Sequence, residues 1–217
     1  MTLQSPLAQS EPPHDCPLCP RLVALREECR AEHPDWWNAP VPSFGDPDAR
    51  IALVGLAPGR TGANRTGRPF TGDHAGELLY ATLAKFGLAQ GGYEARVDDG
   101  LALRDIIIVN AVRCLPPQNK PLPEEVRNCR AFLKPALHAL PRARIFIALG
   151  QIAHQSTVKA LGGKLPKAPF AHLAEHRMPS GKIVIDSYHC SRYNQNTGRL
   201  TPEMFEAVFA RAVALSR

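Results

Sequence analysis

The chain has 217 residues, of which 44% are hydrophobic and 21% are charged. That balance is typical of a globular protein and excludes an intrinsically disordered one. The formal net charge of +6 favours a polyanionic partner such as nucleic acid. No apolar run is long enough to cross a bilayer, so we expect no membrane partner.

The amino-terminal residues MTLQSPLAQSEPPHDC carry neither the basic nor the apolar region of a secretory signal. We therefore expect a cytoplasmic protein whose cysteines are reduced or bind metal. Residues 1–15 are polar and contain prolines, and we expect them to form a flexible tail. The length suits a single domain over residues 1–217, with a monomer as the default state.

Short apolar strands alternate with helical segments along the chain. A first helix is expected over residues 20–33. The strands are expected at Ile51–Val54, Ile106–Val109, Ile145–Leu149 and Ile183–Ile185. Further helices are expected at 75–86, 123–140, 151–161 and from Thr201 onward.

This alternation predicts an α/β fold. Strands that are apolar on both faces are typical of a sheet covered on both sides, so we expect a three-layer α/β/α sandwich around a central, mainly parallel four-stranded sheet. Ligands of such folds bind outside the carboxyl ends of the strands. The segments that follow the strands are therefore the candidate functional segments.

The segment after the first strand, residues 55–73, reads GLAPGRTGANRTGRPFTGD and is rich in glycine. Glycine lets the backbone approach a ligand closely. Arg60, Arg65 and Arg68 can each meet a DNA phosphate, and the ring of Phe70 can stack on a base. The alternative is a flexible surface loop whose arginines are only solvated.

Two asparagines follow the second strand. Asn110 carries a side-chain amide that can donate to and accept from the edge of a pyrimidine. Asn119 lies in a turn between prolines. Turn chemistry explains each asparagine equally well when it is considered alone.

The segment after the fourth strand, residues 187–200, reads SYHCSRYNQNTGRL. His189 can donate a hydrogen bond to negative charge that develops on a leaving base. Ser191, Arg192 and Asn194 continue a polar loop that can hold a DNA backbone. A structural role is the alternative for a single histidine, and the strand-end position favours function.

Four of the six cysteines form two pairs, Cys16 with Cys19 and Cys114 with Cys129. Four thiolates can hold either structural zinc or an iron–sulfur cluster, and their spacing leaves both open. Cys29 lies on the apolar face of the first helix and is expected in the core. Cys190 lies beside His189 and can be a reactive thiol, and the simpler interpretation is a small residue in a tight loop.

The segments GLAPGRTGANRTGRPFTGD and HCSRYNQNTGRL resemble the first and last active-site motifs of the uracil-DNA glycosylase superfamily. The runs ANRTGRPFTGD and NTGRL are most similar to its family 5, or type b, members. The resemblance covers roughly residues 14–216. It implies a 4Fe–4S cluster on Cys16, Cys19, Cys114 and Cys129. It also implies a monofunctional hydrolysis that removes uracil from DNA and leaves an abasic site.

The resemblance also implies roles for individual residues. Phe70 would stack on the flipped-out base, and His189 would stabilise the uracil anion. Arg60, Arg65, Arg68, Ser191 and Arg192 would contact the DNA. The expected base-binding residues are Gly55, Leu56, Ala57, Pro58, Gly59, Phe70, Asn110 and Asn194.

The sequence departs from related branches at Leu56. Those branches have an acidic or amide residue there, and such a residue can position water. Asp73 is the nearest carboxylate within the motif, and Asn119 matches the family pattern, so these two are the candidate water-positioning residues. Family 5 members act on several deaminated bases, so hypoxanthine and xanthine are further expected substrates.

Three other interpretations compete with this one. The first is a non-catalytic DNA-binding module with structural zinc, which leaves the glycine-rich segment and His189 unexplained. The second is a related branch that bonds covalently to its product, for which His74 is the nearest candidate residue. The third is an oxidoreductase, which GLAPGRTG argues against because it is not a G-x-G-x-x-G motif.

Overall fold

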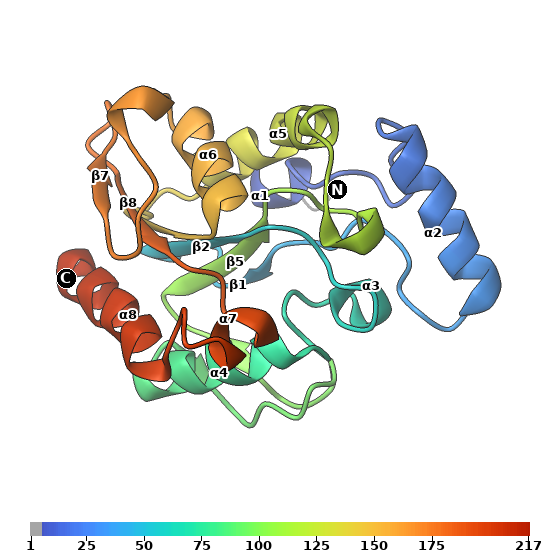
Figure 1. The fold of residues 1–217 in the computed structure, drawn as a ribbon, viewed down its shortest axis with the longest axis horizontal. Helices are drawn as coiled ribbons and strands as arrows, with labels where there is room; N and C mark the ends of the chain where they lie inside the picture. Colours follow the sequence, from blue (N-terminus) through green and yellow to red (C-terminus); the bar gives the residue numbers. More distant parts are fainter. Residues whose placement is uncertain (1–5) are drawn as a thin grey trace.

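The computed structural model describes residues 6–217, so residues 1–5 of the expected tail lie outside the described residues. A central sheet has helices on both faces, and α2 lies to one side of this body (Figure 1). The helices are α1 Pro6–Gln9, α2 Pro20–Glu32, α3 Ala63–Thr66, α4 His74–Lys85, α5 Pro123–His138, α6 Gln151–Ala160, α7 Arg192–Asn196 and α8 Pro202–Ser216.

The central sheet has six strands in the order β1-β5-β2-β6-β8-β7. Its four inner strands run parallel, and β1 and β7 pair antiparallel at the two edges. The strands are β1 Phe44–Gly45, β2 Ile51–Gly55, β5 Ile106–Asn110, β6 Ile145–Leu149, β7 Glu175–Arg177 and β8 Ile183–Ser187. A separate small sheet joins β3 Ala89–Gln90 and β4 Ala102–Leu103.

The α/β fold is confirmed, but the expected number of four strands is wrong. The four predicted strands are the four parallel ones. The two edge strands were missed because each is very short: β1 is Phe-Gly and β7 is Glu-His-Arg. Neither has the apolar run or the alternation that predicts a strand from sequence.

Both faces of the sheet are buried. Ile51 and Leu53 of β2 pack into the cluster that contains the apolar residues of α4 and α8. Ala52 and Val54 of the same strand pack into the cluster formed with α5 and α6. Successive side chains of a strand point to opposite faces, so this alternation is what a sheet covered on both sides requires.

Residues 6–15 pack against the body, contrary to the flexible tail expected there. Leu7 of α1 packs on the apolar cluster that includes α5. The Glu11 carboxylate lies 2.6 Å from the buried Arg113 guanidinium, and it accepts the backbone N–H of Ser43 at 3.1 Å. These partners lie far along the chain, and local composition carries no sign of them.

A buried polar network braces the carboxyl end of β8. Asp186 is fully buried. Its carboxylate lies 2.7 Å from Nδ1 of His154 on α6 and 2.9 Å from Nε2 of His176 on β7. The other ring nitrogen of His154 lies 2.9 Å from the carbonyl of Ala168. The network ties α6 and β7 to the strand that leads into residues 187–191.

Candidate active site

A cavity of about 540 Å³ lies at the carboxyl ends of β2, β5 and β8. This is where parallel α/β sheets bind their ligands. The cavity brings together segments 56–75, 110–119 and 189–192, which are far apart in sequence. Its lining residues are Leu56, Ala57, Gly59, Arg60, Thr61, Ala63, Phe70, Asp73, His74, Ala75, Asn110, Asn119, His189, Ser191 and Arg192.

Gly55, the last residue of β2, lies against Asn110 and Phe70. A Cβ atom at position 55 would lie 2.4 Å from Oδ1 of Asn110 and 2.9 Å from Cζ of Phe70. Only glycine therefore leaves room for an amide and an aromatic ring to meet at this edge. Within the described residues, the buried Oδ1 of Asn110 has no hydrogen-bond partner. Because Asn110 lines the cavity, this acceptor is free to receive an N–H group of a ligand.

Phe70 is held in an unusual backbone conformation. Its φ of 54° lies in the left-handed region, which aromatic residues rarely adopt. The hydroxyl of Tyr93 donates to the Phe70 carbonyl at 3.1 Å, and the hydroxyl of Tyr80 donates to the Pro69 carbonyl at 2.5 Å. These bonds over-determine the loop and hold the Phe70 ring at the cavity wall.

Arg68 was expected to contact DNA, but the structure buries its side chain. Its side chain is 6% exposed and makes a two-bond ion pair with the fully buried carboxylate of Asp99, at 2.8 and 2.7 Å. Its Nε also donates to Thr71 at 2.7 Å. The guanidinium is buried, and protein groups of the fold accept its N–H groups. It joins the loop that carries Phe70 to residues 94–101.

Asp73 caps the amino end of α4. Its Oδ1 accepts the backbone N–H of Gly76 at 3.2 Å. Its Oδ2 lies so close to Gly62 that a Cβ atom there would be 2.5 Å away. Burial raises the pKa of the Asp73 carboxyl above its usual range. The cavity therefore has a partly desolvated carboxylate in its wall.

His189 lines the same cavity as Asp73 and lies in the segment after β8. Its ring centroid is 6.0 Å from that of Phe70, with the planes inclined by 29°. Burial lowers the pKa of His189 from its usual 6.5 to about 4, so the ring is neutral near pH 7. A neutral imidazole still offers one N–H donor.

Asn194, which we expected to bind the base, is not among the residues that line the cavity and instead supports the His189 segment. Its Nδ2 donates to the His189 carbonyl at 2.8 Å. Ser191 caps α7 by accepting the N–H of Asn194 at 3.4 Å. The Asn194 amide is therefore a support for the segment that carries the histidine.

Some of the remaining predicted residues line the cavity, and others lie outside its lining. Asn119 lines the cavity and has a left-handed φ of 56°, next to Gln118 at 55°. Gly55 and Pro58 are buried and are not among the lining residues. His74 lines the cavity and lies 3.1 Å from the exposed carboxylate of Glu77.

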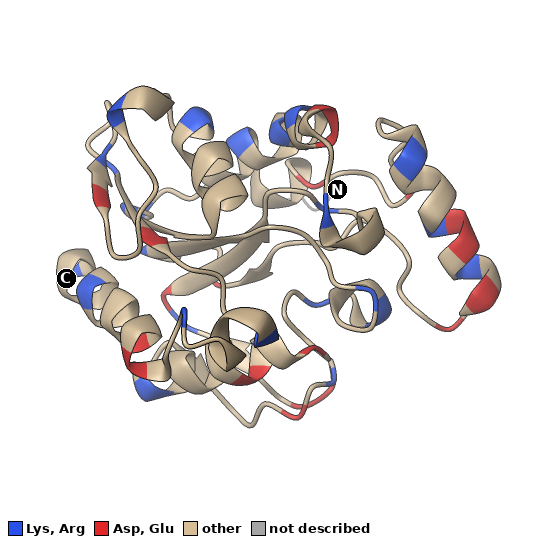
Figure 2. Ribbon diagram, viewed as in Figure 1, with Lys and Arg blue, Asp and Glu red and all other residues tan. Residues whose placement is uncertain are grey.

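Basic residues lie on both sides of the cavity mouth. Arg60 and Arg192 line it and are exposed, and Arg65 is exposed on α3. Figure 2 shows basic positions at α3 and α7, the two short helices beside the cavity. Sequence reasoning missed Tyr193, whose side chain is 71% exposed on α7. An aromatic residue in the last motif was the available signal.

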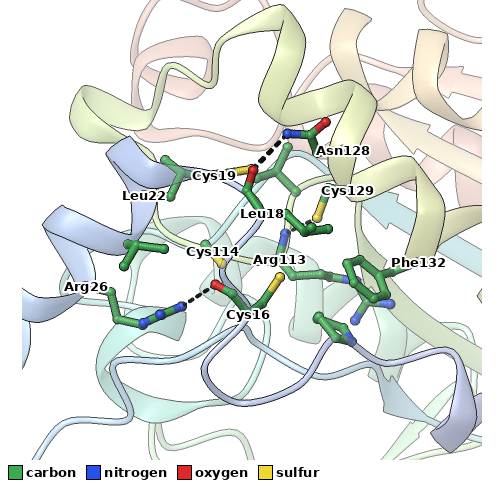
Figure 3. Close-up of a pocket in the computed structure, with 13 residues that line it drawn as sticks. Cys16, Leu18, Cys19, Leu22, Arg26, Arg113, Cys114, Asn128, Cys129 and Phe132 are labelled. Atoms are coloured by element: carbon green, nitrogen blue, oxygen red, sulfur yellow. Dashed lines mark hydrogen bonds between the residues drawn. The ribbon is translucent and has the colours of Figure 1, made fainter.

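The four paired cysteines line a second cavity, between α2 and the segments that follow β5 (Figure 3). The backbone N–H of Arg113 donates to Sγ of Cys129 at 3.2 Å, and Nδ2 of Asn128 lies 3.6 Å from Sγ of Cys19. Apolar side chains complete the wall, including those of Leu18, Leu22, Val112 and Phe132. Cys29 is buried in α2, as expected, and Cys190 is buried as well.

The four sulfurs of this cavity do not have the close spacing of a tetrahedral zinc site. In the described part of the chain, no three of the four sulfurs lie within 4.8 Å of one another. Tetrahedral zinc, with zinc–sulfur bonds of about 2.3 Å, would hold the sulfurs roughly 3.8 Å apart. Burial raises the pKa of Cys114 to about 12 and that of Cys129 to about 11. Thiolates in this cavity therefore need a cationic group to stabilise them.

Comparison with known proteins identifies the family. A family model described as the uracil DNA glycosylase superfamily matches residues 42–212. A type-5 uracil-DNA glycosylase of Thermus thermophilus is 48% identical over 93% of this chain and 94% of its own length. One of Pyrobaculum aerophilum is 43% identical over 92% of this chain and 88% of its own. A type-4 uracil-DNA glycosylase of Archaeoglobus fulgidus is 38% identical over only 53% of this chain and 50% of its own length.

The chain therefore belongs to the uracil-DNA glycosylase superfamily, and within it to the type-5 uracil-DNA glycosylases, which are hydrolases. This confirms the resemblance drawn from the two motifs. Among the described residues, no helix has the length and apolar character needed to cross a membrane.

The burial of His189 can be tested by NMR. We expect its ring Cε1–H resonance, assigned by its loss in His189→Gln, to titrate with a midpoint near pH 4 because burial disfavours the imidazolium. A midpoint near the ordinary value of about 6.5 would contradict this description of the cavity.

Proposed function

We propose that this chain hydrolyses the N-glycosidic bond of uracil in single- and double-stranded DNA and leaves an abasic site. We further propose that hypoxanthine and xanthine are substrates and that the chain acts as a single-domain monomer without a lyase step. One observation carries the proposal. A single cavity combines a free amide acceptor on Asn110, an aromatic wall on Phe70, a neutral imidazole on His189 and a carboxylate on Asp73.

Entry of the target requires base flipping, because its glycosidic bond is out of reach inside a duplex. Arg192 is exposed at the mouth and is suited to hold a phosphate beside the flipped nucleotide. Arg60 also lies there, paired with Glu32, and because an exposed ion pair is weak, its guanidinium can exchange that carboxylate for a phosphate. The exposed ring of Tyr193, beside Arg192, is suited to fill the gap that the base leaves in the stack.

Recognition of the base rests on two contacts. The ring of Phe70 stacks on the base, which tolerates any flat heterocycle. Oδ1 of Asn110 accepts an N–H group from the polar edge of the base, and backbone groups of residues 56–59 complete that edge. One amide contact discriminates weakly among bases that carry a ring N–H, so the cavity suits several deaminated bases.

Cleavage of the glycosidic bond depends on stabilising the base as a leaving group. The electron pair of the glycosidic bond moves to the base, which leaves as an anion, and the sugar becomes oxocarbenium-like. His189 donates its N–H to the oxygen on which the negative charge develops. Asp73 stabilises the positive sugar or holds the attacking water. Water then adds to the sugar and loses a proton, which completes the hydrolysis.

The apolar side chain of Leu56 explains why other residues must position the water. It lines the cavity where a polar side chain would position water, and it can neither donate nor accept a hydrogen bond. Asp73 and Asn119 are the polar residues available for that role. Catalysis then depends more on stabilising the leaving group than on activating the nucleophile.

We propose that Cys16, Cys19, Cys114 and Cys129 hold a 4Fe–4S cluster. The wide spacing of the sulfurs and the all-cysteine donor set support it. When bound, the cluster supplies covalent links that fasten α2 to the body and so stabilises the fold. The base-binding cavity is formed by other residues, and none of the four cysteines lines it.

Base release from oligonucleotides tests the proposed activity and its range. We expect single-turnover release of uracil, with measurable release of hypoxanthine and xanthine, and strong loss of each in His189→Gln. Binding of DNA without release of any base would instead support the non-catalytic module. Release of uracil alone would overturn the broader range.

The role of Asp73 can be separated from its capping of α4. Asparagine also caps helices, so Asp73→Asn removes the charge and keeps the cap. We expect uracil release to fall about 10²-fold in single turnover, with an unchanged melting temperature. Asp48→Asn, the same change at an exposed carboxylate that does not line the cavity, serves as the control. A full rate in Asp73→Asn would show that the carboxylate has no part in the chemistry.

A further inference from the structure

Two buried arginines lie beside the cysteine cavity. The side chains of Arg26 and Arg113 are 7% and 1% exposed, and both residues line that cavity. Nη1 of Arg26 donates to the carbonyl of Cys16 at 3.1 Å, a contact drawn in Figure 3. Within residues 6–217, the Nε atoms of both arginines are buried without a hydrogen-bond partner.

The two positive charges are balanced unequally by protein groups. The Arg113 guanidinium lies 2.6 Å from the carboxylate of Glu11. The nearest carboxylate to Arg26 belongs to Glu27, which is 3.6 Å away and exposed. A buried charge without a close partner is costly, so Arg26 requires negative charge from another source. The cysteine cavity that it lines is the neighbouring source.

We propose that Arg26, assisted by Arg113, supplies the counter-charge for the group held by the four cysteines. This inference rests on the cluster in the proposed function and goes beyond it. An oxidised 4Fe–4S core carries two positive charges, so with four thiolates the whole group has a net charge of minus two. Nearby guanidinium groups offset that charge and supply N–H donors to an assembly rich in sulfur acceptors.

The consequence is a defined reduction potential. One electron, taken from an electrode, changes the net charge of the group from minus two to minus three. Positive charge close by stabilises the more negative state, and so raises the potential. Arg26 should have the larger effect because its charge is not offset by a close carboxylate. Glu11 should lower the potential because it offsets Arg113.

The test uses the full chain with its group bound. Iron and acid-labile sulfide are measured first, and then the potential is measured at an electrode with the reduced form followed by electron paramagnetic resonance. We expect Arg26→Gln to shift the potential to more negative values and Glu11→Gln to shift it to more positive values. Lys134→Gln removes a charge from an exposed position of α5 and should leave it unchanged.

Each outcome bears on one claim. The inference about Arg26 would be wrong if the reduction potential were unchanged in Arg26→Gln. It would also be wrong if Arg26→Gln and Glu11→Gln shifted the potential in the same direction. Neither result would count against the proposal that the four cysteines hold a cluster. Absence of iron and sulfide from the wild-type protein would contradict both the proposed cluster and the inference about Arg26. The proposed glycosylase activity would still be tested separately by base release. If Arg26→Gln loses the group, Arg26→Lys keeps the charge and should keep the wild-type potential. A clear negative shift in Arg26→Lys would contradict the proposal.

Discussion

The close approach at Gly55 is the constraint on which the candidate site depends. Gly55 ends β2, which lies between β5 and β6 in the sheet. Because it has no side chain, the amide of Asn110 at the end of β5 and the ring of Phe70 meet across it. A base recognised by this site would be held between a group at the end of one strand and a loop that follows its neighbour. The carboxyl edge of a parallel sheet is suited to such a site because it brings distant segments together.

Contacts with residues outside the loop stabilise the conformation of the loop that carries Phe70 and Asp73. Phe70 has a left-handed backbone, and the surrounding structure must stabilise it. The hydroxyls of Tyr80 and Tyr93 bind adjacent carbonyls of this loop, and the Arg68–Asp99 ion pair joins it to residues 94–101. These contacts hold the aromatic ring of Phe70 beside that of His189, with the two ring centroids 6.0 Å apart.

Sequence reasoning succeeded where the signal was local. Apolar strands followed by unusual segments predicted the four parallel strands and the residues at their carboxyl ends, and Asp73, Asn119 and His189 do line one cavity. Glycine content and strand position are local properties, so they were visible without a structure.

Three expectations differ from the structure because contacts within the fold, near or far along the chain, occupy the side chains concerned. Arg68 has the same sequence character as Arg60, but Asp99 pairs with it and buries it. The side-chain amide of Asn194 donates to the His189 carbonyl within the same loop. Glu11 was assigned to a tail because nothing near it reveals Arg113. Composition reports which groups a segment carries, whereas tertiary pairing decides which of them remain free.

The most direct test of this account is single-turnover uracil release by Gly55→Ala. The added methyl would displace Asn110 and Phe70, and a misplacement of about 1 Å can reduce catalysis about 10²-fold. Gly92→Ala, which adds a methyl to open space, is the matched control. We expect the rate of Gly55→Ala to fall about 10²-fold or more, whereas the control keeps the wild-type rate. A wild-type rate in folded Gly55→Ala would contradict it.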